Sequence, residues 1–133
     1  MKVFLTGGTG FLGRHIAWRL VREGCEVVFT GRNPVSAECV LQKARGKIRW
    51  LPIQHGEHGT SELLTKEMVN VDAVVHCAGL SSPWGTKESF RKANILGTEE
   101  ILNASQKNSI KRLVHISTPS IYFHYQDQFS ILE

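Results

Sequence analysis

Hydrophobic positions along the chain form two alternating kinds of segment. Short runs rich in β-branched and aromatic residues occur at 2–6, 26–30, 47–53, 72–77 and 112–117. Longer stretches with apolar residues every three or four positions occur at 11–23, 34–46, 60–69 and 86–107. Buried strands that alternate with amphipathic helices are typical of a parallel sheet covered on both faces. The pattern therefore predicts a β-α-β-α-β-α-β-α-β order.

Two local signals support these boundaries. Asn33-Pro34 is a good helix start, with Asn as the N-cap and Pro at the first helical position. Gly24 fits the C-terminal cap of the helix predicted over 11–23. Both signals place the turns between elements where the apolar periodicity changes.

Length and composition narrow the class of protein. The 133 residues are enough for one domain, and 41% hydrophobic with 21% charged residues is an ordinary globular balance. This excludes a disordered tail, a collagen-like fibre and a disulfide scaffold. No apolar run approaches the roughly 20 residues that cross a bilayer, so we expect no membrane partner. Three cysteines without a C-x-x-C pair predict reduced thiols and a cytoplasmic protein.

The basic balance is modest and dispersed. The net charge is +4, and the 16 Lys and Arg are scattered singly apart from two adjacent pairs. No basic run interleaves with aromatic residues, so we do not expect a nucleic-acid partner. Attraction of anionic small molecules, phosphates included, accounts for the same charge.

A glycine-rich segment carries the sharpest functional signal. Gly7, Gly10 and Gly13 keep a T-G-x-x-G-x-x-G spacing between the first predicted strand and helix. The first glycine permits a tight turn, the second allows a pyrophosphate to approach the backbone, and the third allows close packing of helix on strand. The helix N-terminus then offers free N–H groups to phosphates. The alternative is a glycine-rich turn without a ligand.

This motif and three later ones resemble the extended short-chain dehydrogenase/reductase family, in its epimerase/dehydratase or 3β-hydroxysteroid dehydrogenase-like branches. The later motifs are His76-Cys77-Ala78-Gly79, Asn94-Ile95-Leu96-Gly97-Thr98, and the segment from Val114 to Tyr122. The resemblance implies a Rossmann-type doubly wound parallel sheet of order 3-2-1-4-5, with residues 1–133 as a partial NAD(P)-binding domain. It also implies a set of cofactor contacts: Gly7, Thr9, Gly10, Phe11, Leu12, Gly13, Cys77, Ala78 and Gly79.

The end of the second strand bears on which dinucleotide is bound. NAD-binding members of the family carry an acid there, whereas this chain has Gly31 followed by Arg32. An arginine can take a 2′-phosphate that a carboxylate would repel, so we expect NADP(H) to be preferred over NAD(H). Arg32 as a solvated loop residue is the alternative. Where the family often has an Asp near the adenine, this chain has Gln54, which could still accept a hydrogen bond.

The resemblance also implies catalytic positions. Counting back from Tyr122 selects Thr118 as the hydroxyl that would donate to a substrate carbonyl, with Ser117 and Ser120 as substitutes. Ordinary capping of a strand end by Ser and Thr is the alternative. Asn94 has an organising role in the family. Its spacing from Phe90, Gly97, Ile101 and Ala104 places it on an apolar, inward helix face, where a satisfied core Asn is the other interpretation.

The family's Tyr-x-x-x-Lys pair is missing from this sequence. Tyr122 and Tyr125 are the only tyrosines, and no lysine follows Lys111. We therefore expect the N-terminal part of a longer enzyme, without its last strands, that is catalytically silent by itself. We also expect the apolar tail between Ile121 and Leu132, with the edge of the fifth strand, to lie in an intermolecular contact such as a homodimer, or beside further residues of the longer enzyme.

Two functions follow from these residues. The first is the NADP(H)-binding portion of an oxidoreductase that acts on an alcohol/carbonyl pair, or of an epimerase or dehydratase with a transient ketone, in either case with a small-molecule substrate. The second is a dinucleotide-binding sensor or interaction module without turnover. We expect no metal, since His55 and His58 lie in a glycine-containing loop without a third ligand. We interpret the Cys77 thiol as a small hydrophobe at a strand end, in preference to a nucleophile.

Overall fold

A computed structural model describes residues 1–118, and the predictions for Ser120 and for the tail lie outside them. The described part contains one parallel sheet in the order β3-β2-β1-β4-β5, which confirms the predicted strand order. Its strands are β1 (Lys2–Thr6), β2 (Glu26–Gly31), β3 (Ile48–Pro52), β4 (Ala73–His76) and β5 (Leu113–His115).

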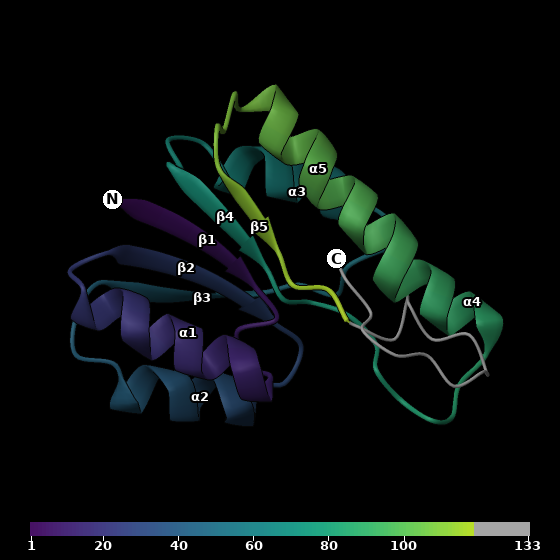
Figure 1. Ribbon diagram of the computed structural model, residues 1–133, viewed down its shortest axis with the longest axis horizontal. Helices are drawn as coiled ribbons and strands as arrows, with labels where there is room; N and C mark the ends of the chain where they lie inside the picture. The colour runs from purple at the N-terminus through teal and green to yellow at the C-terminus, as the bar shows by residue number, and fades with distance from the viewer. Residues whose placement is uncertain (119–133) are drawn as a thin grey trace, which may run out of the picture.

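Helices cover both faces of this sheet (Figure 1). One face carries α1 (Phe11–Arg22) and α2 (Pro34–Lys43), and the other carries α3 (Thr60–Glu67) and α5 (Gly97–Lys107). Successive strand side chains point to opposite faces, so the strands feed two separate apolar cores. Val3, Leu5 and Phe29 pack with α1 and α2, whereas Phe4 and Val28 pack on the other side with α3 and α5.

The predicted helix starts and turns are largely present. α2 begins at Pro34, and the Asn33 side chain accepts a hydrogen bond from the Ser36 N–H at 3.0 Å, as an N-cap does. Gly24 follows α1 with a positive φ of 79°. None of the helices within residues 1–118 combines the length and the apolar character needed to cross a membrane.

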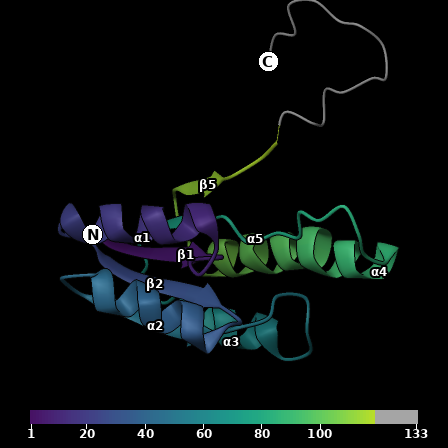
Figure 2. The ribbon, with the colours of Figure 1, turned by 90° about the horizontal axis from the view of Figure 1, so that it is seen from below.

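The fourth predicted helix differs from expectation. It is divided into α4 (Lys87–Phe90), a π-helical segment η1 (Arg91–Leu96) and α5. A π-turn adds a residue to the turn and shifts the helix face, so the regular spacing does not continue through it. Figure 2 shows α4 and the loop before it lying beyond the carboxyl ends of β1 and β2, where no sheet covers the helix.

The prediction that Asn94 lies on an apolar, inward face is therefore wrong. Ile101 and Ala104 are buried beneath α5, whereas Asn94, on the π-helical segment, is exposed. The close crossing predicted at Gly97 is present, since a Cβ added there would lie 2.9 Å from Cβ of His55. The helix thus enters the core only at Gly97.

Candidate functional site

The glycine-rich turn packs tightly between β1, α1 and the loop after β4. Gly7 has a φ of +67°, and an added Cβ would lie 2.8 Å from the backbone nitrogen of Ala78. A Cβ on Gly13 would lie 2.8 Å from the carbonyl carbon of Gly7. The Gly10 N–H donates to the Gly7 carbonyl at 2.9 Å. Side chains at Gly7 and Gly13 would push this turn apart.

The N-terminus of α1 has the features that a phosphate group requires. Gly10 is its N-cap, no side chain caps the helix within the described residues, and no acidic residue lies in its first turn. Phe11 is 76% exposed and Leu12 is 46% exposed, so this end of the helix is open to solvent, and the first N–H groups of a helix have no partner within the helix. The buried Nε of Arg14 has no hydrogen-bond partner in the described part of the chain. The N–H groups at the helix N-terminus, the Arg14 side chain and the tightly packed glycine-rich turn fit a dinucleotide.

Hydrogen bonds connect the first residues of the loop after β4 to the end of β1 and to η1. Thr6 Oγ1 accepts from the backbone N–H groups of Cys77 at 3.1 Å and of Ala78 at 3.0 Å. The Asn94 side chain accepts from the Leu80 N–H at 2.6 Å and donates to the Leu80 carbonyl at 3.1 Å. Asn94 therefore has the partners expected of it, although it is exposed.

Cys77 is half-buried beside the core under α1. Burial raises the pKa of its thiol, which disfavours the reactive thiolate. This supports its interpretation as a small hydrophobe. Together with Ala78 and Gly79, it lies in the loop that borders Gly7. A cofactor contact by any of the three stays a prediction.

At the end of β2, a side chain at residue 31 would require the side chain of Thr9 to move. Gly31 is buried, and a Cβ added there would lie 2.5 Å from the Oγ1 of Thr9. Arg32 is exposed, and its side chain forms no hydrogen bond or ion pair within residues 1–118. Gln54 is also exposed, and its side-chain amide donates to Glu57 at 3.1 Å. An adenosine contact by Arg32 or Gln54 stays a prediction.

His55 and His76 are both named from the sequence above, but the burial of both side chains beneath the turn was not predicted. His76 is 1% exposed, and its Nδ1 lies 2.7 Å from Thr6 Oγ1. His55 Nε2 lies 3.1 Å from Thr30 Oγ1, which also accepts from the Gly7 N–H at 3.3 Å. The pKa of each imidazole is lowered to about 4, for His55 by burial and for His76 by burial together with the neighbouring His55 and His115. Both rings are therefore neutral at neutral pH.

A signal for these histidines does exist in the sequence. Thr6, Thr30 and His76 are polar residues at the ends of otherwise apolar strands, and parallel strands bring such ends to one edge of the sheet. Among the described residues no group of three or more His, Cys, Asp or Glu is arranged to hold a metal ion.

Ser117 and Thr118 follow β5 at the same carboxyl edge, and both are exposed. The loop after β4, the η1 segment with Asn94, and the glycine-rich turn also lie at this edge (Figures 1 and 2). The topology therefore brings the predicted catalytic and cofactor positions to one end of the sheet. Their roles stay predictions.

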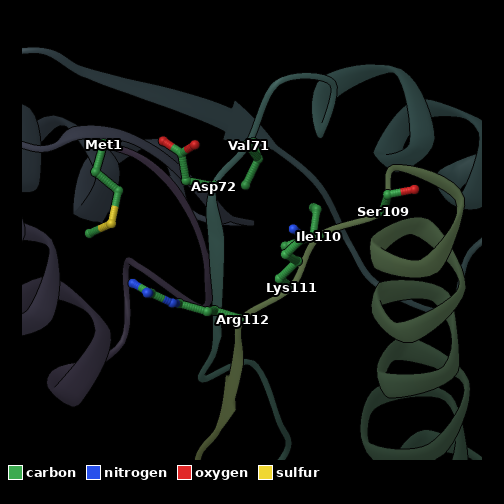
Figure 3. A pocket seen from close by; sticks show the side chains of 7 residues that line it. All are labelled: Met1, Val71, Asp72, Ser109, Ile110, Lys111 and Arg112. Carbon is green, nitrogen blue, oxygen red and sulfur yellow. The ribbon is translucent and has the colours of Figure 1, made fainter.

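A cavity of about 550 Å³ lies at the opposite end of the sheet (Figure 3). It is lined by residues that precede β1, β4 and β5: Met1, Val71, Asp72, Ser109, Ile110, Lys111 and Arg112. Asp72 Oδ2 within it accepts from the backbone N–H of Lys2 at 2.6 Å. Because ligands of open α/β sheets bind at the carboxyl ends of the strands, this cavity is separate from the candidate site.

A parallel sheet of this order, with a glycine-rich turn between its first strand and helix, defines a Rossmann-type α/β protein. Residues 3–131 match the model of the NAD dependent epimerase/dehydratase family. The chain belongs to this family, which confirms the resemblance drawn from its motifs.

Individual relatives agree with this membership. The chain is 36% identical, over 91% of its length, to the 4-hydroxy-2-methyl-3-oxo-4-farnesyl-3,4-dihydroquinoline-1-oxide ketoreductase of Stigmatella aurantiaca, and it covers 34% of that protein. It is 33% identical over 91% of its length to the 2-alkyl-3-oxoalkanoate reductase of Stenotrophomonas maltophilia, of which it also covers 34%. The chain thus spans about a third of these relatives.

The fold agrees with solved structures. A UDP-glucose-4-epimerase from Stenotrophomonas maltophila, solved with NAD and formylated UDP-arabinopyranose, superposes with a TM-score of 0.84. The match covers 98% of this chain and 40% of the epimerase, at 24% identity. At this identity the likeness shows the fold, and the predicted Rossmann-type architecture is confirmed.

Proposed function

We propose that this chain binds NADP(H) in preference to NAD(H), as the dinucleotide-binding portion of an oxidoreductase or epimerase/dehydratase. The observation that carries the preference is the end of β2. Gly31 carries no carboxylate that would repel a 2′-phosphate, and Arg32 beside it is exposed without a side-chain partner in the described part of the chain. An unpaired guanidinium can form a bidentate, charge-assisted contact with a 2′-phosphate.

The rest of the cofactor would lie along the glycine-rich turn. The exposed N-terminus of α1 offers N–H groups and the positive end of a helix dipole to the pyrophosphate. The loop Cys77–Gly79, fixed beside Gly7, would border the dinucleotide. Dinucleotide binding is supported by the family itself, and the solved epimerase contains NAD. The choice of NADP(H) therefore rests on Gly31 and Arg32.

The proposed reaction is the interconversion of an alcohol and a carbonyl on a small-molecule substrate, either as a net reduction or as a transient step. The names of two relatives, a ketoreductase and a reductase, support this class. When bound, the nicotinamide ring would supply or accept the hydride. Thr118, with Ser117 beside it, would donate a hydrogen bond to the carbonyl oxygen, and Asn94 would hold the β4 loop in place.

Turnover by this chain alone is not part of the proposal. No lysine follows Lys111, so a Tyr-x-x-x-Lys pair cannot be drawn from Tyr122 or Tyr125. The second candidate, a binding module without turnover, is favoured by the same observation. Once binding has been established, an assay of NADPH oxidation on the purified chain distinguishes an enzyme from a binding module without turnover.

Calorimetric titration of the 133-residue chain with NADPH, NADP⁺, NADH and NAD⁺ tests the proposed preference. We expect both phosphorylated forms to bind more tightly than their counterparts. Equal affinity, or a preference for NAD(H), would contradict the role given to Arg32. Failure of all four to bind would contradict dinucleotide binding by this chain.

A further inference from the structure

One continuous chain of hydrogen bonds joins the end of β1 to the helix on the far side of the β4 loop. Thr6 Oγ1 lies 2.7 Å from His76 Nδ1, and His76 Nε2 lies 3.0 Å from Thr98 Oγ1. Thr98 Oγ1 in turn donates to the Asn94 carbonyl at 2.8 Å. His76 is thus the buried link between the glycine-rich side of the site and the η1–α5 helix.

The two threonine hydroxyls fix the direction of every bond in this chain. Thr6 Oγ1 already accepts from two backbone N–H groups, those of Cys77 and Ala78, so its own proton is left to donate to His76 Nδ1. Thr98 gives its proton to the Asn94 carbonyl, so its oxygen accepts from His76 Nε2. His76 must therefore be neutral, with its single proton on Nε2.

The surroundings of the ring agree with this assignment. The titratable side chains that face it are His55, from the loop after β3, and His115, from β5, with ring centroids at 6.3 and 5.2 Å. A carboxylate, that of Glu100, lies near His55. Its Oε2 is 3.9 Å from His55 Nδ1 and accepts a hydrogen bond from the Gly56 N–H. A proton on His76 Nδ1 would face the Thr6 hydroxyl proton and break the bond that orients it.

We propose that His76 is a positioning residue for the dinucleotide site, held as its Nε2–H tautomer by Thr6 and Thr98. The tautomer directs the Thr6 hydroxyl so that its lone pairs face the Cys77 and Ala78 N–H groups. This sets the β4 loop close against Gly7, where an added Cβ would lie 2.8 Å from the backbone nitrogen of Ala78. The role in cofactor binding rests on the proposed function, whereas the tautomer is a property of the chain alone.

The tautomer is tested directly on the unliganded chain. A long-range ¹H–¹⁵N correlation spectrum of histidine-labelled protein distinguishes protonated from unprotonated ring nitrogens. We expect His76 to show a protonated Nε2 and an unprotonated Nδ1 at neutral pH, with assignment from the spectrum of His76→Asn. A protonated Nδ1, or an average of the two tautomers, would overturn the assignment.

The positioning role is tested with two isosteric variants. Thr6→Val removes the hydroxyl that accepts hydrogen bonds from the Cys77 and Ala78 N–H groups. We therefore expect the Kd for NADPH to rise about tenfold. Thr98→Val is the matched variant: it also loses a His76 bond but leaves Thr6 and its two N–H donors in place, so we expect a smaller loss of affinity than in Thr6→Val. His76→Leu removes the acceptor of the Thr6 proton, so we expect its Kd for NADPH to rise, whereas His76→Asn retains an acceptor near the Nδ1 position and should lie closer to wild type. Equal affinity of His76→Leu and the wild type would overturn the role of His76.

Each outcome has a distinct meaning. Equal losses in Thr6→Val and Thr98→Val, or no loss in either, would overturn the positioning role while NADPH binding by the wild type still supports the proposed function. The wild type could instead show the Nε2–H tautomer and bind none of the four dinucleotides. That result would overturn the proposed function and the positioning role, and would support the tautomer assignment. Circular dichroism reports whether each variant folds. If Thr6→Val does not fold, the ¹H–¹⁵N correlation spectrum of the wild type still decides the tautomer.

Discussion

Acidification should destabilise this fold through His55 and His76. Both imidazoles are buried, which lowers their pKa to about 4 from an ordinary value near 6.5. At pH values between these two, the unfolded chain binds protons that the folded chain does not. The stabilising contribution is therefore complete above about pH 6.5 and is lost as the pH falls toward 4.

The magnitude follows from the two pKa values. For one histidine, the free energy of unfolding should fall by about 2 kcal/mol between about pH 7 and about pH 5. The two contributions are not independent, because the pKa of His76 is lowered in part by His55. Glu100 acts in the opposite sense, because burial raises the pKa of its carboxyl. A net loss of roughly 2–3 kcal/mol is expected, which is a large fraction of the stability of a small domain.

Urea unfolding followed by circular dichroism at several pH values measures this loss. His55→Gln removes one titrating ring, so its free energy of unfolding should fall less steeply with pH than that of the wild type. His58→Gln, at an exposed position in the same loop, is the matched control and should keep the wild-type slope. A change of less than about 0.5 kcal/mol in the wild type between pH 7 and pH 5 would refute the reasoning.

Four further outcomes are expected. Arg32→Ala should weaken NADPH selectively, by roughly 1.5–3 kcal/mol in calorimetry, with Arg45→Ala as the exposed control; equal losses for NADH would contradict a 2′-phosphate contact. Gly13→Ala should abolish dinucleotide binding, because its Cβ would displace the Gly7 carbonyl, and retained affinity would exclude this turn as the site. The purified chain should not oxidise NADPH with ketones or nucleotide sugars; turnover that is lost in Thr118→Ala would show otherwise. Light scattering should find self-association through the edge of β5, where Val114 is 54% exposed, and a soluble monomer at high concentration would contradict it.

Much of the fold could be predicted from the sequence because its signals are local. The apolar runs, the N-cap at Asn33 and the glycines at 7, 10 and 13 each act within a few residues of themselves. Strand order then follows from the family that these motifs resemble, and the sheet has that order. Gly31 followed by Arg32 likewise indicates the proposed cofactor without any structure.

Only the tertiary structure decided what lies beneath and beside the turn. The bond between Thr6 and His76 joins residues 70 positions apart, and it exists because β1 and β4 are neighbours whose ends coincide. Regular helical periodicity placed Asn94 inward, whereas the π-helical segment and the end of the sheet leave it exposed. The apolar periodicity of a sequence indicates which side of a helix or strand is apolar. It does not indicate where the neighbouring helix or strand ends. The end of that neighbour decides which polar groups lose contact with water.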